Sequence, residues 1–480
     1  MNTPPVVVVI PTLSSLGVTR VASLLHWIAV DRERKFASFI IDNGGHYDKR
    51  WFRDHKDPVG AAAEHEKLRI DVYTPGRNIG VAASWNEAMR RYPDSWLVIA
   101  NDDAFFNYTT VEALVQAAEQ DSDAVLVGCE LGFGFPLFLL KVKEAVERVG
   151  YFDEQFWPAY GEDNDYSWRM HLADLKKIQV TVGVREPDPG TTSREMNFDR
   201  EALRERATIR YVAKWGGIPG YEKLRTPRVA GLVPEVFMAA VPWRAENLEE
   251  ILRVLAKDPP RCVHLYLDSW RGHPDPKLPP GLTVVVDRND GPPRGPGPRW
   301  LGASVAPDDV LAVVIDDDMK LDQHYLVRTM AAWTRLQEPF SWGGGGLSWG
   351  MPGHYTRDQD HDARLFCMGA GTAAVPAKLL RGIEQDPDAA VMLGYRGHDE
   401  AFISWWLRDH RLWRPAGLAI AEDTKLSTDG RAQWAFKSRL LPFEKRLEDR
   451  GWVPPEGAPT RSVSMTAPTG QFAWKRKPWQ

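Results

Sequence analysis

The chain has 480 residues, of which 43% are hydrophobic and 26% are charged. At about 100 to 200 residues per domain this length predicts two to four domains, and the composition excludes wholesale disorder. The 60 Lys and Arg residues are opposed by 65 Asp and Glu residues, which gives a net charge of −5. This balance excludes a global basic field, so binding to nucleic acid is not indicated and would need a local basic patch.

Two apolar runs, Val6–Ile10 and residues 133–142, are the longest in the chain. Both fall below the roughly 18 residues that a membrane helix needs, so we expect no membrane span. No basic segment precedes the first run and Pro11 ends it, which favours a strand over a signal peptide and predicts a cytoplasmic protein. Wide spacing of the cysteines excludes a disulfide framework and a CxxC zinc site: Cys129, Cys262 and Cys367.

Short apolar runs alternate with helical patterns in the first part of the chain. The runs Val6–Ile10, Phe39–Ile41 and Trp96–Ala100 have the pattern of buried strands, and Val18–Val30 has the pattern of a helix. Continuous apolar strands separated by helices are typical of a parallel sheet that is covered on both faces. We therefore predict an α/β, Rossmann-like fold.

The same order of elements begins again after the loop at Gly216–Gly220. A strand is predicted at Val236–Val241, a helix at Glu246–Ala256 and a strand at Val263–Leu267, and corresponding features recur about 220 residues apart. This repetition predicts two tandem α/β domains with mostly parallel sheets. The expected boundaries are domain 1 at 1–217, a linker at 218–233, domain 2 at 234–455 and a flexible basic tail at 456–480.

Single acids follow the second predicted strand of each half. Asp42 comes directly after Phe39–Ile41, and Asp268 comes directly after Val263–Leu267. Ligands of open α/β sheets bind at the carboxyl ends of the strands, so each acid is placed to accept hydrogen bonds from a ribose or a base. A turn that simply ends the strand is the alternative.

A group of acids follows the next buried strand in each half. In the first half the motif is Asn101-Asp102-Asp103, with two acids, and in the second half it is Asp316-Asp317-Asp318, with three. Adjacent carboxylates repel one another unless water or a cation screens them. Oxygen-only ligands suit Mg²⁺ or Mn²⁺, with a nucleotide diphosphate supplying further oxygens. Acids in a solvated loop are the alternative, which the presence of two copies after matching strands makes weaker.

A second matched pair of acidic motifs comes later in each half, Glu162-Asp163 and Asp399-Glu400. Each lies where a helix is expected to begin, and acids there are stabilised by the helix dipole, so capping is one interpretation. The other is general-base catalysis, because a hydroxyl nucleophile must lose its proton as it attacks.

Taken in order, these motifs resemble those of the family 2 glycosyltransferases of GT-A fold, especially the rhamnosyl- and galactofuranosyltransferase-like branch. The resemblance covers about residues 5–215 and is carried by these residues: Pro11-Thr12, Asp42, Gly76–Gly80, Asn86, Asn101–Asp103, Gly150–Glu154, Glu162-Asp163 and Arg169.

The resemblance implies a role for each candidate site residue of the first half. Asp42 and Asn78 would contact the nucleotide-sugar donor. Asp102 and Asp103 would hold the diphosphate and a divalent ion, Mn²⁺ or Mg²⁺, with Asp103 as a metal ligand. Asp163, beside Glu162, would be the catalytic base of an inverting displacement.

The second half resembles a more divergent GT-A domain. By this resemblance Asp268, Asp316 and Asp317 would bind the donor, Asp318 would bind the metal, and Asp399, beside Glu400, would be the base. Both halves then supply a candidate active site, and the enzyme is expected to be a hexosyl- or pentosyltransferase.

Two features depart from the family pattern. Residues 180–194 contain no histidine, where many members carry a metal ligand, and the first acidic motif begins with Asn101. The alternatives are therefore two active domains, or one catalytic domain beside a domain that only binds carbohydrate or nucleotide. The donor (a UDP-, GDP- or dTDP-sugar) and the acceptor (a glycan, a protein or a modified nucleobase, the last making a DNA-base glycosylating enzyme) stay open, as does a binding protein without turnover.

Overall fold

The chain divides into two compact units, residues 1–230 and 231–480, called unit 1 and unit 2 below. The helix predicted at Val18–Val30, apart from position 21, and the predicted tail at 456–480 lie outside the described residues. A computed structural model describes residues 5–15, 17, 21, 36–47, 70–129, 135–182, 191–227, 232–291, 294–342, 347–348, 363–367, 372–387, 389, 393, 399–415 and 420–422.

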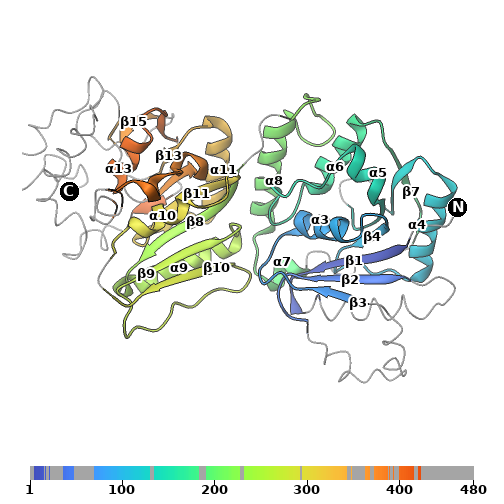
Figure 1. Cartoon of the computed structure of the whole chain (residues 1–480), viewed down its shortest axis with the longest axis horizontal. Coiled ribbons are helices and arrows are strands. Elements are labelled where there is room, and N and C mark those ends of the chain that lie inside the picture. The colour runs from blue at the N-terminus through green and yellow to red at the C-terminus, as the bar shows by residue number, and fades with distance from the viewer. Residues whose placement is uncertain are drawn as a thin grey trace, which may run out of the picture. The chain divides into compact units, whose positions relative to one another are not determined.

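Unit 1 is built on a mixed sheet whose described strands lie in the order β3-β2-β1-β4-β6-β5-β7 (Figure 1). Strands β1 to β4 are parallel to one another, and β6 is antiparallel to both β4 and β5. Its elements are β1 Val6–Thr12, β2 Ala37–Asp42, β3 Ile70–Tyr73, α3 Val81–Arg91, β4 Trp96–Ala100, α4 Tyr108–Gln120, β5 Ala124–Gly128, β6 Leu137–Lys141, α5 Val142–Arg148, α6 Glu162–Leu172, β7 Lys176–Gln179, α7 Thr191–Glu195 and α8 Arg200–Trp215.

Helices cover both faces of this sheet. Alternate residues of β1 belong to opposite hydrophobic clusters, as the two-residue period of a strand requires. Val6, Val8 and Ile10 pack with the residues of α4, whereas Val7 and Val9 pack with those of α3, α5 and α6. The strands predicted at Val6–Ile10, Phe39–Ile41 and Trp96–Ala100 are confirmed as β1, β2 and β4.

Unit 2 has a second mixed sheet, with its described strands in the order β10-β9-β8-β11-β16-β13-β17-β15-β14. Its elements are β8 Val233–Ala240, η3 Pro242–Arg244, α9 Ala245–Lys257, β9 Val263–Asp268, β10 Val284–Asn289, α10 Gly297–Ser304, β11 Val310–Asp316, β12 Met319–Leu321, α11 Tyr325–Leu336, β13 Phe340–Ser341, β14 Leu347–Ser348, β15 Ala363–Cys367, β16 Thr372–Pro376, η4 Ala377–Leu380, η5 Ile383–Gln385, α13 Asp399–Trp406, β17 Leu412–Arg414 and β18 Ile420–Glu422.

The first five strands of this sheet repeat the arrangement of unit 1. Strands β10, β9, β8 and β11 are parallel, and β16 is antiparallel to β11, as β6 is to β4. One face packs on α9 and α11 and the other on α10 and α13. The prediction of two α/β units with largely parallel sheets is therefore confirmed, and each sheet also has antiparallel strands that the pattern did not predict. Strand β8 begins three residues before the predicted strand, because Val233 already pairs with Val310.

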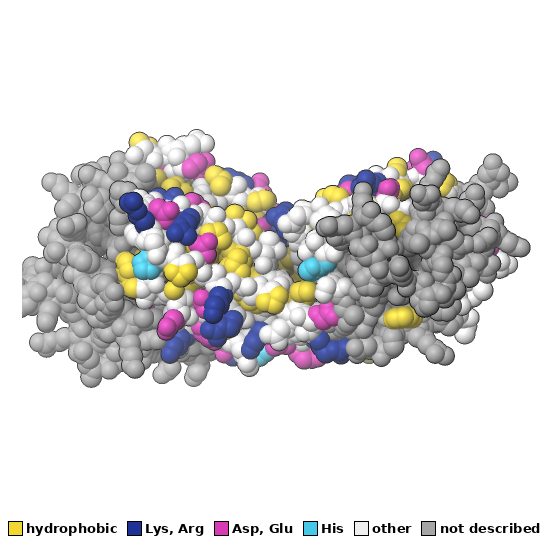
Figure 2. All heavy atoms as spheres, turned by 90° about the horizontal axis from the view of Figure 1, so that it is seen from below, with side chains coloured by type: hydrophobic (Ala, Val, Ile, Leu, Met, Phe, Trp, Pro, Cys, Tyr) yellow, Lys and Arg dark blue, Asp and Glu magenta, His cyan; other side chains and the backbone are white. Residues whose placement is uncertain are grey.

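On the face seen in Figure 2, Lys and Arg side chains are interspersed with Asp and Glu side chains over the described surface. The near balance of charge in the sequence is therefore also a local property of this face. No helix within the described residues is long and apolar enough to cross a membrane.

Candidate functional site

The acids of unit 1 that the sequence singles out lie at the carboxyl ends of neighbouring parallel strands. Thr12, the last residue of β1, pairs with Asp42 at the end of β2, and the amide of Asn43 donates a hydrogen bond of 2.8 Å to the Thr12 carbonyl. On the other side of β1, strand β4 ends at Ala100, just before Asp102. The sheet thus brings the single acid and the acidic motif to the same edge.

Asp42 is fully buried, with 0% of its surface exposed. Its Oδ2 atom accepts a hydrogen bond of 2.6 Å from the backbone amide of Tyr47. Its Oδ1 atom is also buried and has no hydrogen-bond partner among the residues that the structure describes. A buried carboxylate oxygen without a donor is costly, so a ligand or water that donates a hydrogen bond there would be stabilised.

Asn78 shapes the loop that leads into α3. Its Oδ1 atom accepts a hydrogen bond of 2.9 Å from the amide of Gly80, and the amide of Ile79 donates one of 3.1 Å to Asn43 Oδ1. Gly80 has a φ of 80°, and a Cβ atom there would lie 2.7 Å from the ring of Trp157. Only glycine fits this close approach. The hydrogen bonds of Asn78 and Ile79 hold the turn beside Asn43.

Asp102 is held by a residue that sequence reasoning missed. The hydroxyl Oγ1 of Thr192, on α7, lies 3.2 Å from both carboxylate oxygens of Asp102. A Cβ atom on Gly17 would lie 2.3 Å from Asp102 Oδ2, so the chain at Gly17 also lies against this carboxylate. Asp102 and Asp103 are both partly buried. Within the described parts of the chain, no group of three or more His, Cys, Asp or Glu side chains could hold a metal ion.

The predicted helix start at Glu162 is confirmed, and the acid pair Glu162 and Asp163 forms the first turn of α6. Gly161 precedes it with a left-handed φ of 88°. Burial raises the pKa of Asp163 to about 6, although the backbone amides of Asn164 and Phe135 act to lower it. Burial and then the charge of Asp163 raise the pKa of Glu162 well above its ordinary value. The pair can therefore hold one proton near neutral pH.

One short segment links this pair to the acidic motif. The carbonyl of Pro136 accepts a hydrogen bond of 3.1 Å from the amide of Asn101, and the neighbouring amide of Phe135 hydrogen-bonds the carboxylate of Asp163. Asp163 therefore lies beside the end of β4 that carries Asp102. The structure brings the predicted base close to the acidic motif, which lies 60 residues earlier in the sequence.

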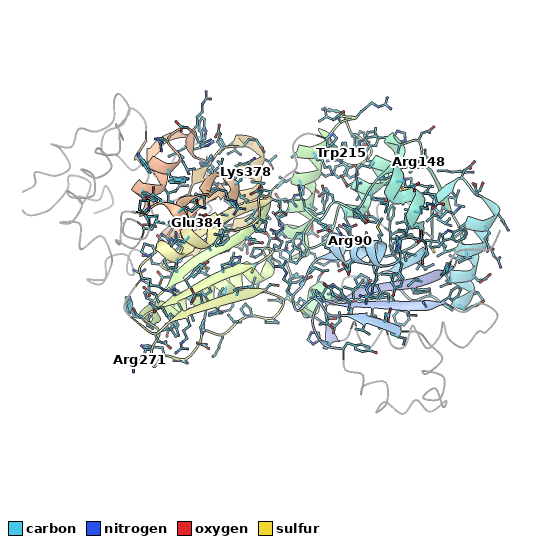
Figure 3. The ribbon with its side chains drawn as sticks, viewed as in Figure 1. Arg90, Arg148, Trp215, Arg271, Lys378 and Glu384 are labelled. Atoms are coloured by element: carbon cyan, nitrogen blue, oxygen red, sulfur yellow. The ribbon has the colours of Figure 1, made fainter. Side chains whose placement is uncertain are left out.

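A buried ion network fixes α6 against α8. Asp165 Oδ1 accepts a hydrogen bond of 2.8 Å from the indole of Trp215, at the end of α8 (Figure 3), and lies 2.6 Å from Lys214 Nζ. Lys214 also lies 2.7 Å from Asp153, and Arg169 lies 2.8 Å from Asp165 Oδ2. Arg169 thus orients Asp165, and the network holds the helix whose first turn carries Asp163.

Replacing Glu162 with glutamine is expected to stabilise the chain at neutral pH. The pKa of Glu162 is raised in the folded state, so its titration does not change the free energy of unfolding below the unfolded pKa of about 4.3. As the pH rises above that value, Glu162 lowers the free energy of unfolding, by about 1.4 kcal/mol for each unit between the unfolded and folded pKa values. Thermal unfolding of E162Q and wild type should agree at pH 4, and the variant should unfold at a higher temperature at pH 7. The exposed E147Q variant serves as the control, and an E162Q variant that is less stable at pH 7 would contradict the burial argument.

In unit 2, Asp268 lies at the end of β9 and Asp316 at the end of β11, on either side of β8. The carboxylate of Asp268 accepts hydrogen bonds from the amides of Arg294 and Gly295, each at 3.0 Å, and from Asn289 Nδ2 at 2.7 Å. Asp268 therefore closes the loop after β10 with donors of its own unit.

The other acids of unit 2 contact two arginines that sequence reasoning missed. Arg299, on α10, donates hydrogen bonds to Asp316 and, at 2.7 Å, to Asp399. Arg244 lies 2.5 Å from Asp317 and 3.2 Å from Asp318. Asp399 begins α13, as predicted, and Glu400 is its second residue. Four of the predicted acids, Asp316, Asp317, Asp318 and Asp399, thus have an arginine partner, whereas Asp268 is bound by backbone amides and by Asn289.

Comparison with known proteins bears on unit 1. Residues 39–171 match the family model described as glycosyl transferase family 2. A stretch of 33 residues is 65% identical to a galactofuranosyl glycosyltransferase of Leishmania donovani, and it covers 7% of this chain and 8% of that protein. The residues that match the family model include Asp42, Asp102, Asp103 and Asp163.

Solved structures also align with the chain. The mannosyltransferase PcManGT of Pyrobaculum calidifontis, in complex with GDP-Man and Mn²⁺, aligns at 16% identity and a TM-score of 0.34, over 45% of this chain and 64% of that one. S. aureus TarS 1–349 in complex with UDP-GlcNAc aligns at 13% identity and a TM-score of 0.31, over 40% of this chain and 64% of that one. Each alignment spans less than two thirds of the other protein. By its match to the family model, the segment at residues 39–171 of this chain is similar to the glycosyl transferase family 2 domain.

Proposed function

We propose that unit 1 transfers a sugar from a nucleoside-diphosphate sugar to an acceptor hydroxyl. The observation that carries the proposal is the pair of buried Glu162 and partly buried Asp163, whose raised pKa values provide a proton acceptor within the residues that match the family 2 model. A general base works best when its pKa lies near the operating pH, and the value of about 6 for Asp163 meets that requirement.

Asp42 is the proposed contact to the nucleoside of the donor. Its buried Oδ1 atom, with no partner among the described residues, suits a hydrogen-bond donor from a ribose or a base. Its place at the carboxyl end of β2 agrees with the usual position of ligands in open α/β sheets. Asn78 acts beside it by holding the loop before α3.

Asp102 and Asp103 are the proposed ligands of Mn²⁺ or Mg²⁺. Two carboxylates are a suitable protein contribution, because Mg²⁺ is commonly bound by one or two carboxylates together with substrate phosphates. When bound, the ion neutralises the charge that builds up on the departing diphosphate. Thr192 positions Asp102 through the contacts of 3.2 Å to its carboxylate, so the ligand has a fixed orientation before the donor arrives.

Asp163 takes the proton of the acceptor hydroxyl as the hydroxyl oxygen attacks the anomeric carbon of the donor sugar. The new carbon–oxygen bond forms while the bond from that carbon to the diphosphate oxygen breaks, so a single displacement inverts the anomeric configuration. The neutral form of Glu162 keeps a second negative charge away from Asp163. The ion network of Asp165 and Lys214 holds α6 and thereby positions the base.

The proposal is tested with a panel of UDP-, GDP- and dTDP-sugars that includes a galactofuranosyl donor, in the presence of Mn²⁺ or Mg²⁺. Release of the nucleoside diphosphate is measured with and without candidate glycan, protein and modified-nucleobase acceptors. We expect release from donors of one nucleotide, and mass spectrometry of the acceptors identifies the added sugar. Binding of a nucleotide sugar without release or transfer across the whole panel would instead favour a binding protein.

The turnover of unit 1 is expected to depend on pH through Asp163. The carboxylate is the active form, so protonation below its pKa of about 6 removes the base. We expect kcat/KM to be level above about pH 7 and to fall about tenfold per pH unit well below pH 6. A profile that is flat from pH 5 to pH 8, with the protein folded throughout, would contradict this assignment.

A further inference from the structure

Unit 2 contains a cluster of four acids and two arginines at the carboxyl end of β11. We call it the arginine-closed cluster: Asp316, Asp317, Asp318, Asp399, Arg244 and Arg299. The sequence places these acids where a metal, a donor diphosphate and a catalytic base are expected. Their contacts within unit 2 lead to a different role.

Arg299 joins the predicted base to the predicted donor site. It is buried, and its guanidinium donates one hydrogen bond to Asp316 and another, of 2.7 Å, to Asp399 Oδ2. The indole of Trp300 donates a second hydrogen bond, of 2.8 Å, to the same Asp399 oxygen. Asp399 is 0% exposed. These two donors hold Oδ2 of Asp399 against α10, and the other oxygen, Oδ1, is buried and has no hydrogen-bond partner among the residues that the structure describes. The guanidinium of Arg299 is thus a fixed positive charge beside this carboxylate.

Arg244 neutralises the remaining two acids. It lies 2.5 Å from Asp317 and 3.2 Å from Asp318, and the backbone amide of Val241 donates a further hydrogen bond of 2.9 Å to Asp317. Asn247 donates hydrogen bonds of 2.7 Å and 3.1 Å to the carbonyls of Asp317 and Met319. The turn after β11 is therefore fixed by donors of unit 2 itself.

A divalent ion does not fit this electrostatic setting. Asp317, Asp318 and Asp399 each lie within 3.2 Å of a guanidinium, and Asp316 accepts a hydrogen bond from the guanidinium of Arg299. An ion bound by these carboxylates would sit next to a fixed positive charge in a partly buried place, where repulsion is strong. Asp268, the predicted nucleotide contact, likewise has hydrogen bonds from the chain on both of its oxygens.

We infer that Arg244 and Arg299 are the built-in counter-cations of unit 2, and that the arginine-closed cluster is not a second metal-dependent transfer site. Asp399 then positions α13 against α10 rather than acting as a base. The inference concerns unit 2 alone, so it goes beyond the function proposed for unit 1. It also predicts that the chain binds one catalytic metal ion at most.

The test is a titration of the full chain with Mn²⁺, in which free Mn²⁺ is followed by electron paramagnetic resonance in the presence of a nucleoside diphosphate. The double variant D316N/D318N removes two carboxylates of unit 2 but leaves the pairs Arg244–Asp317 and Arg299–Asp399, so its fold should persist. The matched variant D102N/D103N removes the corresponding pair of unit 1. We expect D316N/D318N to bind as much Mn²⁺ as wild type, with an affinity within twofold.

Loss of one bound ion, or a tenfold lower affinity, in D316N/D318N would overturn the inference. If D102N/D103N also leaves binding unchanged, or if wild type binds no Mn²⁺, the metal site proposed for unit 1 fails while the inference for unit 2 stands. As a second measurement, R299Q should unfold at a temperature several degrees lower, because the buried Asp399 and the partly buried Asp316 lose their counter-charge. An unchanged unfolding temperature in R299Q would show that Arg299 does not hold the cluster, which also overturns the inference.

Discussion

Replacement of Asp163 with asparagine is expected to lower turnover by about 10²- to 10⁴-fold, the usual contribution of a positioned general base. The amide cannot accept the acceptor proton, yet it has nearly the same shape and can keep the hydrogen bond from the Asn164 amide, which is 2.7 Å long. Donor affinity, measured by calorimetry, should therefore stay within a few-fold of wild type. The measurement is kcat for nucleoside-diphosphate release and for transfer.

The exposed D94N variant is the matched control, because it removes one carboxylate of unit 1 away from the site. It should keep the wild-type rate and the wild-type unfolding temperature. If D163N turned over donor as fast as D94N, Asp163 would have no role as the base, and Glu162 would be the next residue to test.

Replacement of Asp102 and Asp103 with asparagine is expected to lower transfer by at least about 10²-fold. Both carboxylates are proposed to hold the ion that stabilises the leaving diphosphate, and removing such stabilisation of developing charge is among the most costly changes in an active site. The rate that remains in D102N/D103N should no longer rise when Mn²⁺ is added. The measurement is the initial rate as a function of Mn²⁺ concentration.

The variant T192V separates positioning from binding in the same site. It removes the hydroxyl that lies 3.2 Å from Asp102 but keeps both carboxylates. Its Mn²⁺ dependence should persist, with a higher concentration needed for half-maximal rate. A rate in D102N/D103N that still follows the Mn²⁺ concentration of wild type would show that the ion binds elsewhere.

Much of the fold could be predicted from the sequence because the central strands are continuous apolar runs. Strand β4 occupies the predicted residues Trp96–Ala100, and helix α9 extends the predicted Glu246–Ala256 by one residue at each end. The antiparallel strands were not predicted, since β6 lies between β4 and β5 in the sheet although it follows both in sequence. Such an order depends on how the two faces pack, and the local pattern carries no signal for it.

The acids of the candidate sites could also be predicted, because each follows a strand or begins a helix. Their partners could not. Thr192 is 90 residues from Asp102, Arg299 is 100 residues from Asp399, and Arg244 is 73 residues from Asp317. A threonine or an arginine at such a distance has no pattern that marks it as a partner of a given carboxylate.

The two units therefore show that one acidic motif can have different electrostatic settings. In unit 1 the acid pair at α6, buried Glu162 and partly buried Asp163, has raised pKa values, and Asp42 has a buried oxygen with no partner among the described residues. In unit 2 the acid that begins α13 lies against Arg299 and Trp300. A motif after a strand indicates a candidate site, and the neighbouring charges decide what chemistry it can support.

The most direct test of catalysis by unit 1 compares the initial rates of wild type, D163N and D399N with the donor that wild type turns over. All three proteins are assayed at a temperature at which circular dichroism shows them to be folded. If unit 1 carries the chemistry, D163N loses at least about 10²-fold in rate and D399N stays within about twofold of wild type. A D399N variant without turnover, beside a D163N variant with the wild-type rate, would place the chemistry in unit 2 and contradict the assignment of Asp163 as the base.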